Sequence, residues 1–154
     1  AVRLAGRGAA PAEIEARLVA LQPRADVYAA LDTFEFLRRS GRVGWATAFF
    51  GSFLQVKPLI RLHLSVVSSQ GRVRTRERAF SALVDFARQA APLEQLAILH
   101  TANPDGAGRL SDALADLHPP DRLVPIVEVT PVIGVHVGPN GLGIAIIRQN
   151  EPAE

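Results

Sequence analysis

Residues 130–147, TPVIGVHVGPNGLGIAII, decide how this chain folds, because two apolar runs flank a turn that is rich in glycine and proline. The turn covers Gly138 to Gly141, since proline has no amide donor and both glycine and asparagine favour positive φ. His136 stands between the two runs, next to this turn. We therefore expect its imidazole at the mouth of an apolar wall, with backbone amides of the turn exposed on the same side.

The composition indicates a single domain that can bury a core. A chain of 154 residues with 48% hydrophobic residues buries roughly 70% of its unfolded surface on folding. We find neither an apolar run long enough for a membrane span nor a signal-peptide pattern, so we expect a cytoplasmic protein. The net charge of +2 is too small to be typical of nucleic-acid binding, and the absence of cysteine excludes disulfides and thiolate metal sites.

The first residues, AVRLAGRGAAP, look like the end of an apolar helix, and the sequence contains no methionine. We therefore expect a fragment of a longer protein. In this interpretation, residues 1–25 form a helical lead-in segment, and residues 26–150 form the domain itself.

Helical and strand patterns alternate along this domain. Apolar spacing, prolines and capping residues predict helices that begin at Pro11, after Asp32 or Thr33, at Trp45, at Arg76 and at Pro104, and strands at 26–31, 56–62, 96–101 and 123–129. A hairpin with arms at 64–67 and 72–75 is predicted around the turn SSQG, and it supplies the antiparallel pairing. The pattern predicts an α/β fold, a two-layer domain with a mixed β-sheet and helices packed mainly on one face.

Two kinds of cofactor site are not expected. The segment GPNGLG reverses the glycine spacing of a dinucleotide loop, and Pro139 removes a donor. The four histidines lie far apart without an acidic ligand pattern, so we expect no metal site. His100 ends a buried strand and is interpreted as bonded to neighbouring backbone, and His118 as a helix-end residue.

Alternate arginines occur in the segment GRVRTRER, residues 71–78. Arg72, Arg74 and Arg76 would share one face of a strand. Three interpretations remain open: a solvated edge that resists aggregation, a docking surface for an acidic protein, or a phosphate-contacting ribbon of a nucleic-acid-binding module.

The segment WATAFFGSFL, residues 45–54, has bulky and small side chains interleaved. Phe49, Phe50, Phe53 and Leu54 either belong to the core or line a slot that suits an alkyl chain.

Taken alone, a histidine in this setting more often has a structural role than a ligand-binding one. Two features favour the ligand. His136 adjoins the turn, and Arg42 lies in a second glycine-flanked segment, SGRVG. Both side chains can donate hydrogen bonds to a carboxylate, so an anionic head group above an apolar slot would satisfy both.

Four segments resemble, in order, successive signatures of the C-terminal lobe of the DegV family: DTFEFLRRSGRVG, GSFLQVKPLI, GRVRTRERA and PVIGVHVGPNGLGIAI. The resemblance runs from about Val27 to Ile147. It implies a protein that binds a long-chain fatty acid between two α/β lobes, that presents it to a fatty acid kinase in some members, and that is not itself an enzyme. It implies no cofactor beyond the bound fatty acid.

The resemblance also implies residue roles. His136 matches the histidine that helps hold the carboxylate, and Arg42 matches the arginine of the Gly-Gly-Arg motif. We expect Gly138, Asn140 and Gly141 to shape the site, with Asn140 replacing the second glycine of the usual Gly-Pro-Gly; Ser40 replaces the first glycine of Gly-Gly-Arg. The family's N-terminal lobe supplies further hydroxyl ligands, so that lobe or a homodimer partner is expected to complete the site.

Overall fold

The computed structural model describes residues 1–41, 44, 56–120 and 122–150. These residues contain a six-stranded sheet with the strand order β3-β2-β1-β6-β4-β5. The strands are β1 Ala25–Ala30, β2 Lys57–His63, β3 Val66–Val73, β4 Leu93–His100, β5 Ile126–Glu128 and β6 Leu142–Arg148. In this sheet β4 and β5 pair in parallel, and the other neighbours pair antiparallel. The mixed sheet is confirmed, but its antiparallel pairing extends far beyond the single hairpin that was predicted.

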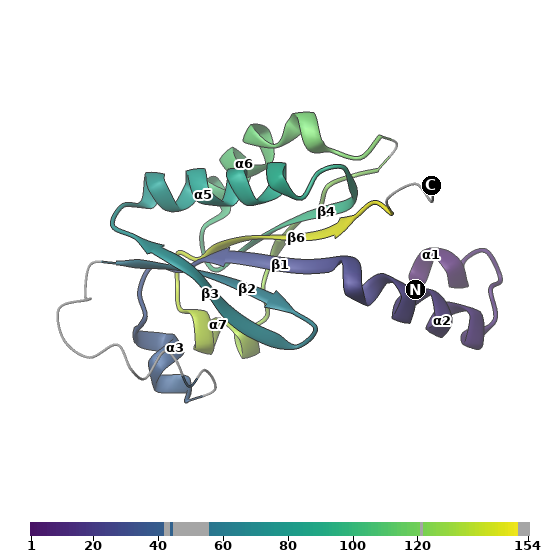
Figure 1. Cartoon of the computed structure of the whole chain (residues 1–154), viewed down its shortest axis with the longest axis horizontal. Helices are drawn as coiled ribbons and strands as arrows, with labels where there is room; N and C mark the ends of the chain where they lie inside the picture. Colours follow the sequence, from purple (N-terminus) through teal and green to yellow (C-terminus); the bar gives the residue numbers. More distant parts are fainter. Residues whose placement is uncertain (42–43, 45–55, 121, 151–154) are drawn as a thin grey trace.

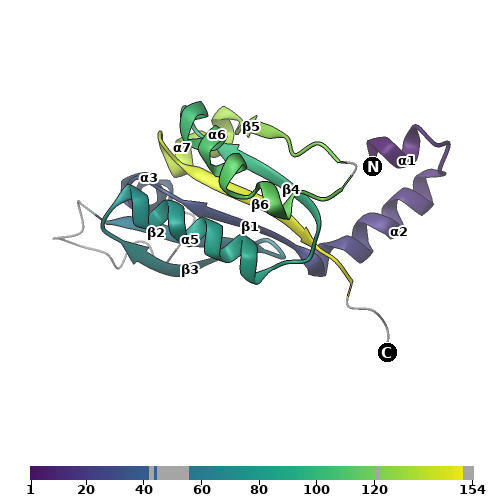
Figure 2. The ribbon, with the colours of Figure 1, turned by 90° about the horizontal axis from the view of Figure 1, so that it is seen from above.

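Helices cover both faces of this sheet. The helices of the described residues are α1 Val2–Ala5, α2 Pro11–Leu21, α3 Glu35–Ser40, α5 Arg76–Gln89, α6 Pro104–Ala113 and α7 Pro131–Val137, with short 3-10 turns η1 Gln22–Arg24 and η2 Ala115–Leu117. Figures 1 and 2 show α5 and α6 on one face, the shorter α3 and α7 on the other, and the α1–α2 arm beyond one end. The predicted α/β class is therefore confirmed.

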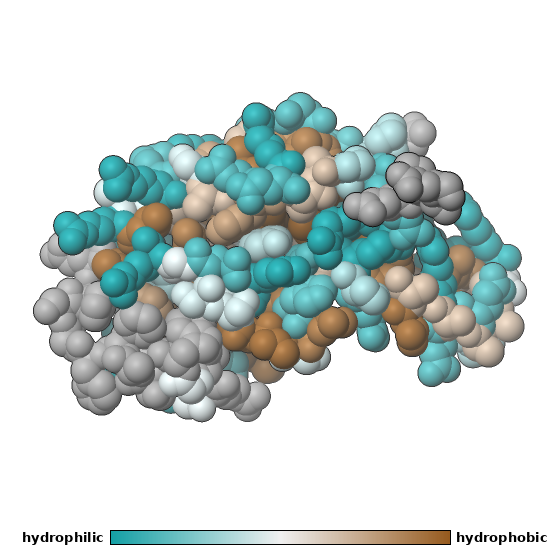
Figure 3. Space-filling view, in the orientation of Figure 1, coloured by the Kyte–Doolittle hydropathy of each residue, from teal (hydrophilic) through white to brown (hydrophobic). Residues whose placement is uncertain are grey.

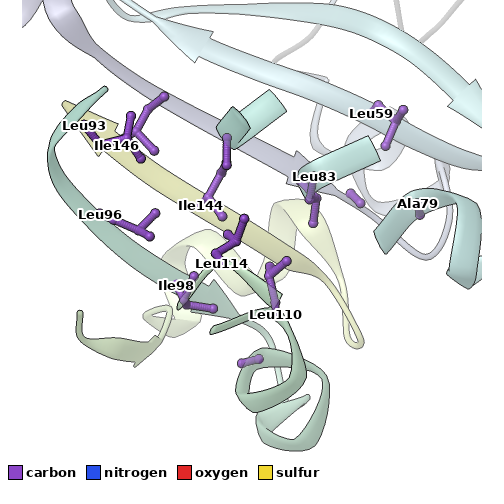
Figure 4. Packing of buried hydrophobic residues seen from close by; sticks show 13 residues of the cluster. Leu59, Ala79, Leu83, Leu93, Leu96, Ile98, Leu110, Leu114, Ile144 and Ile146 are labelled. Atoms are coloured by element: carbon purple, nitrogen blue, oxygen red, sulfur yellow. The ribbon is translucent and has the colours of Figure 1, made fainter. Parts of the chain in front are cut away.

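The main core lies between the sheet and the helices α5 and α6 (Figure 4). Ile98 and Ile144 from the sheet meet Leu83 of α5 and Leu110 of α6, and all four side chains have an exposed fraction of 0%. Burying such a side chain contributes about 1.5–3 kcal/mol each. This core holds α5 and α6 against one face of the sheet. The opposite face of the sheet takes no part in it.

A smaller cluster lies on that opposite face. Leu31, Leu37 and Ile60 are buried there, and Val137 at the end of α7 packs against them. Leu37 belongs to α3, which is in contact with α7. These contacts hold α7 beside the end of the sheet where β6 begins.

Local signals explain where several helices begin and end. The Thr75 hydroxyl accepts a hydrogen bond from the Arg78 amide at 3.2 Å, and the Asn103 side chain accepts one from the Gly106 amide at 3.1 Å. Both are N-caps, which satisfy amides that have no partner within the helix. Gly41 ends α3 in the left-handed conformation with φ of 63°. These starts and stops were predicted correctly.

The two apolar runs of residues 130–147 differ in structure. The first run forms α7, with Pro131 in its first turn, and the second forms β6. Proline at the start of a helix loses no hydrogen bond and has a φ suited to the helix. Val132 and Val135 of α7 are 71% and 64% exposed, so the first run leaves apolar side chains on the surface.

The predicted hairpin turn is wrong. The chain reverses at Leu64 and Ser65, with φ of 46° and 66°, and joins β2 to β3. The segment SSQG lies inside β3, where Ser69 pairs with Ile60 and Gly71 with Leu59 across a register shift. A bulge accommodates the extra residue, so the glycine marks an irregular strand instead of a turn. The strand predicted at 123–129 is also shorter, at Ile126–Glu128.

Candidate functional site

His136 lies in the last turn of α7, on the helix that closes one end of the sheet face opposite the main core. Its ring is half-buried, and its Nδ1 atom is buried without a hydrogen-bond partner among the described residues. Leaving a buried polar atom unpaired costs about 1–3 kcal/mol, so such an atom requires an explanation. A ligand that accepts or donates a hydrogen bond at Nδ1 provides one.

The turn that follows His136 is held by Thr101, at the end of β4. The Thr101 hydroxyl donates to the Gly138 carbonyl at 2.6 Å and accepts from the Gly141 amide at 2.8 Å. The Asn140 amide donates to the Thr101 carbonyl at 2.8 Å, and the Gly138 amide donates to Gly134 at the same distance. The expectation of exposed amide donors at this turn is therefore wrong, because these amides are bonded within the chain.

The conformation of the turn also depends on residues that tolerate positive φ and on glycines that leave room for their neighbours. Gly138 and Asn140 have φ of 75° and 61°, and asparagine tolerates this region better than most side chains do. A Cβ atom at Gly138 would overlap the Phe36 ring, and one at Gly141 would lie 2.9 Å from the Thr101 hydroxyl oxygen. Phe36 belongs to α3, so the glycine allows α3 to pack closely against the turn.

Part of the predicted site cannot be placed. Arg42 and the segment with Phe49, Phe50, Phe53 and Leu54 lie outside the described residues. The described chain reaches Gly41, the residue that caps α3. The pairing of His136 with Arg42 and the phenylalanine slot therefore stay predictions.

A groove of about 960 Å³ lies on the sheet near the α1–α2 arm. Its apolar lining includes Val27, Leu62, Ala97, Ala145 and Ile147. Figure 3 shows patches of brown apolar surface along the lower part of the molecule, near the β2–β3 hairpin and beside the arm. A groove of this size and lining is typical of sites for small apolar ligands.

The groove and α7 lie on the same face of the sheet. Ile144 and Ile146 of β6 are buried in the main core with α5 and α6. Because neighbouring side chains of a strand point to opposite faces, Ala145 and Ile147 face the other side, where α3 and α7 pack. Along β6 the distance from Leu142, beside the turn, to Ile147 is roughly 17 Å. One extended apolar molecule could therefore reach from the turn into the groove.

The three arginines of the predicted ribbon do not form one continuous strand face. Arg72 lies in β3, whereas Arg76 is the first residue of α5 and bonds Asp32 through Nε at 3.2 Å and Nη2 at 3.0 Å. Arg76 lowers the pKa of Asp32 by this hydrogen bonding, with Lys57 adding to the effect. Arg74 is exposed between them. A partner-binding role for Arg72, Arg74 and Arg76 stays a prediction. The ion pair with Asp32 neutralises the positive charge of Arg76.

Two other histidines have the structural roles expected for them. The Asn103 amide donates to His100 Nδ1 at 3.3 Å, and His118 Nε2 lies 3.2 Å from the Ser111 carbonyl oxygen. Among the described residues no group of His, Cys, Asp and Glu could hold a metal ion. Within the same residues, no helix is long and apolar enough to cross a membrane.

The sequence interpretation missed three features of this site: Thr101, Phe36 and the groove. The alternation of β6 was a usable signal, because Ile144 and Ile146 point one way and Ala145 and Ile147 the other. The contact of Phe36 with Gly138 joins residues about a hundred positions apart, and no local pattern reports it.

Comparisons with known proteins agree on one family. Residues 1–149 match the family model described as "Uncharacterised protein, DegV family". A DegV domain-containing protein of Streptomyces coelicolor is 40% identical over 122 residues, which are 77% of this chain and 43% of that protein. One from Deinococcus radiodurans is 31% identical over 150 residues, covering 95% and 53%. The chain thus spans about half the length of these curated relatives.

Solved structures show the same relationship. A DegV family protein from Thermus thermophilus, described as binding fatty acid, superposes with a TM-score of 0.81 and 27% sequence identity. The match covers 96% of this chain and 54% of that protein.

Proposed function

This chain belongs to the DegV family, and from that premise we propose that it binds a long-chain fatty acid, with the carboxylate at His136 and the acyl chain along the sheet face that holds the groove. The observation that carries this proposal is the buried Nδ1 of His136, which has no partner among the described residues and lies on the same face as an apolar groove of about 960 Å³. The solved Thermus relative, described as binding fatty acid, supports the choice of ligand. The function is binding, and catalysis is not required of any residue here.

The two ends of such a ligand would contribute differently. Each buried methylene contributes about 0.8 kcal/mol, so a dozen contribute on the order of 10 kcal/mol before the cost of association. A charge-assisted hydrogen bond at His136 adds about 1.5–3 kcal/mol. The acyl chain would thus set the affinity, and His136 would set which end lies at the turn.

Two further elements belong to this proposal. Arg42 would be the second donor to the carboxylate, and the segment with Phe49, Phe50, Phe53 and Leu54 would add a further wall for the acyl chain. Because the chain spans about half of its relatives, a second lobe or a second copy of the chain would supply the remaining carboxylate ligands. A carboxylate at the turn, near the surface, could then be presented to a fatty acid kinase.

Native mass spectrometry of the purified chain, followed by solvent extraction, tests the ligand. We expect a co-purifying long-chain fatty acid, or its uptake by a delipidated sample. His136→Gln should weaken binding about ten- to a hundredfold, since it removes one charge-assisted hydrogen bond. His118→Gln is the matched control, because His118 bonds the Ser111 carbonyl at the end of α6, and it should bind as the parent does.

A second pair of variants tests the groove. Ala145→Phe places a ring on the groove floor and should abolish uptake, whereas Ala115→Phe, on the exposed η2 turn, should not. Equal uptake by both variants would show that the acyl chain lies elsewhere, and no uptake by the parent chain would remove the proposed function.

A further inference from the structure

The turn beside His136 contains the dipeptide Asn140–Gly141. Asn140 is exposed, and the structure gives its side-chain amide no hydrogen-bond partner among the described residues. Glycine has no side chain to obstruct its own backbone nitrogen. For this reason, the backbone nitrogen of a residue attacks the side-chain amide of a preceding asparagine most readily when that residue is glycine.

The chemistry needs only water. The Gly141 nitrogen forms a bond to Asn140 Cγ, the bond from Cγ to Nδ2 breaks, and Nδ2 leaves as ammonia with the proton from the Gly141 amide. A five-membered succinimide results. Water then opens this ring at either carbonyl, which leaves aspartate or isoaspartate at position 140 and adds one negative charge to the turn.

The folded turn opposes the first step. For Cγ to reach the Gly141 nitrogen, the peptide group between the two residues must rotate toward the side chain. The Asn140 and Gly141 amides both donate to Thr101, to its carbonyl and its hydroxyl, each at 2.8 Å. The Thr101 amide in turn donates to the Gly141 carbonyl at 3.1 Å. Of these hydrogen bonds, the one from the Gly141 amide to the Thr101 hydroxyl belongs to the rotating peptide group and must break. The Asn140 carbonyl of the same group accepts from Asn103 Nδ2 at 3.5 Å, and this contact is lost as well. The bonds on either side hold the flanking peptide groups to Thr101, which is only 8% exposed.

We propose that Asn140–Gly141 is a deamidation site that Thr101 keeps closed in the folded protein. Opening of the turn exposes the reactive nitrogen, and formation of isoaspartate then prevents the original turn from closing, because it inserts an extra backbone carbon at a position with φ of 61°. The modification marks chains whose turn has opened. This inference does not depend on the proposed ligand.

Peptide mapping with isoaspartate quantification tests the proposal on the full chain. Samples are incubated at mildly alkaline pH in buffer and in a urea concentration that unfolds the chain. The folded parent should form isoaspartate at position 140 about ten- to a hundredfold more slowly than the unfolded chain, which corresponds to a free energy of about 1.4–2.8 kcal/mol for opening the turn. Similar rates in the two samples would overturn the proposal.

Variants of threonine provide the controls. Thr101→Val removes the hydroxyl and should raise the folded-state rate, whereas Thr101→Ser retains a hydroxyl and should stay close to the parent. Thr130→Val is the matched control, since Thr130 makes no side-chain cap bond to α7. A folded Thr101→Val protein that reacts no faster than Thr130→Val would contradict the role given to Thr101.

If Thr101→Val does not fold, hydrogen exchange of the parent protein provides a second test of the proposal. In the parent protein at increasing sub-denaturing urea, isoaspartate formation should rise in parallel with exchange of the Gly141 amide. A deamidation rate that stays constant while this amide exchanges faster would overturn the proposal.

Discussion

The Asp26 carboxylate accepts a hydrogen bond from Arg61 Nε at 2.6 Å, although the Asp26 side chain is only 1% exposed. His63 Nδ1 lies 2.9 Å from the same oxygen, and Arg148 lies 3.5 Å from the other. Asp26 is on β1, and its partners are on β2 and β6, the two strands that pair with β1 in the sheet. One buried carboxylate thus joins three strands where the α1–α2 arm meets the sheet.

Asp26→Asn should destabilise the chain by about 3 kcal/mol, because three cationic or polar partners lose the charge that balances them. We place the value at the low end of the range for buried pairs because the partners are 28–41% exposed. Urea unfolding measures the change. Asp116→Asn is the control, since Asp116 and Arg88 are both more than half exposed, and it should cost under about 1 kcal/mol. Equal losses in the two variants would contradict this role of Asp26.

The ion pair of Asp32 should be visible in the acid stability of the protein. Hydrogen bonds from Arg76 first, and then from Lys57, lower the pKa of Asp32 below 3.8. A carboxyl whose pKa is lower in the folded state contributes stability above its unfolded pKa, and this contribution is lost as pH falls through the folded pKa. The stability difference between the parent and Asp32→Asn should therefore be constant near neutral pH and shrink below pH 3.8. Urea unfolding at a series of pH values checks this, and a difference that persists to lower pH would contradict it.

Gly138→Ala should destabilise the turn by about 1–3 kcal/mol, since φ of 75° is unfavourable for alanine and its Cβ would overlap the Phe36 ring. Adding Phe36→Ala should recover the steric part only. Gly108→Ala is the matched control, because it lies in α6 with nothing within 4 Å of the new Cβ. Alanine there should stabilise the chain by up to about 1 kcal/mol. Thermal unfolding of the four proteins would separate these effects, and a Gly138→Ala protein as stable as the parent would refute the close approach.

The main core should respond to a single large-to-small change. Leu110→Ala removes a side chain with 0% exposure and should cost about 2–5 kcal/mol. Leu123 is 97% exposed, so Leu123→Ala should leave the free energy of unfolding nearly unchanged. Denaturation curves of both variants provide the comparison, and similar midpoints would contradict the placement of α6 on the sheet.

The sequence by itself determined the local elements. The caps at Thr75 and Asn103 and the stop at Gly41 depend on residues within one helical turn, so their effect is visible in the sequence. The four ordered motifs also identified the family from the sequence. The hairpin turn at Leu64 and Ser65 escaped detection because neither leucine nor serine favours positive φ, and the pairing of β2 with β3 holds both residues there.

Only the tertiary structure decided the arrangement of the site. The contact of Gly138 with Phe36 and the hydrogen bonds of Thr101 to the turn join residues that are 37 to about a hundred positions apart, and such contacts depend on strand order. Antiparallel pairing of β6 with both β1 and β4 places the turn, α7 and the groove on one sheet face. A periodic pattern reports which side chains share a face, but the pairing of distant strands decides what that face meets, because this pairing is set by the packing of the whole core.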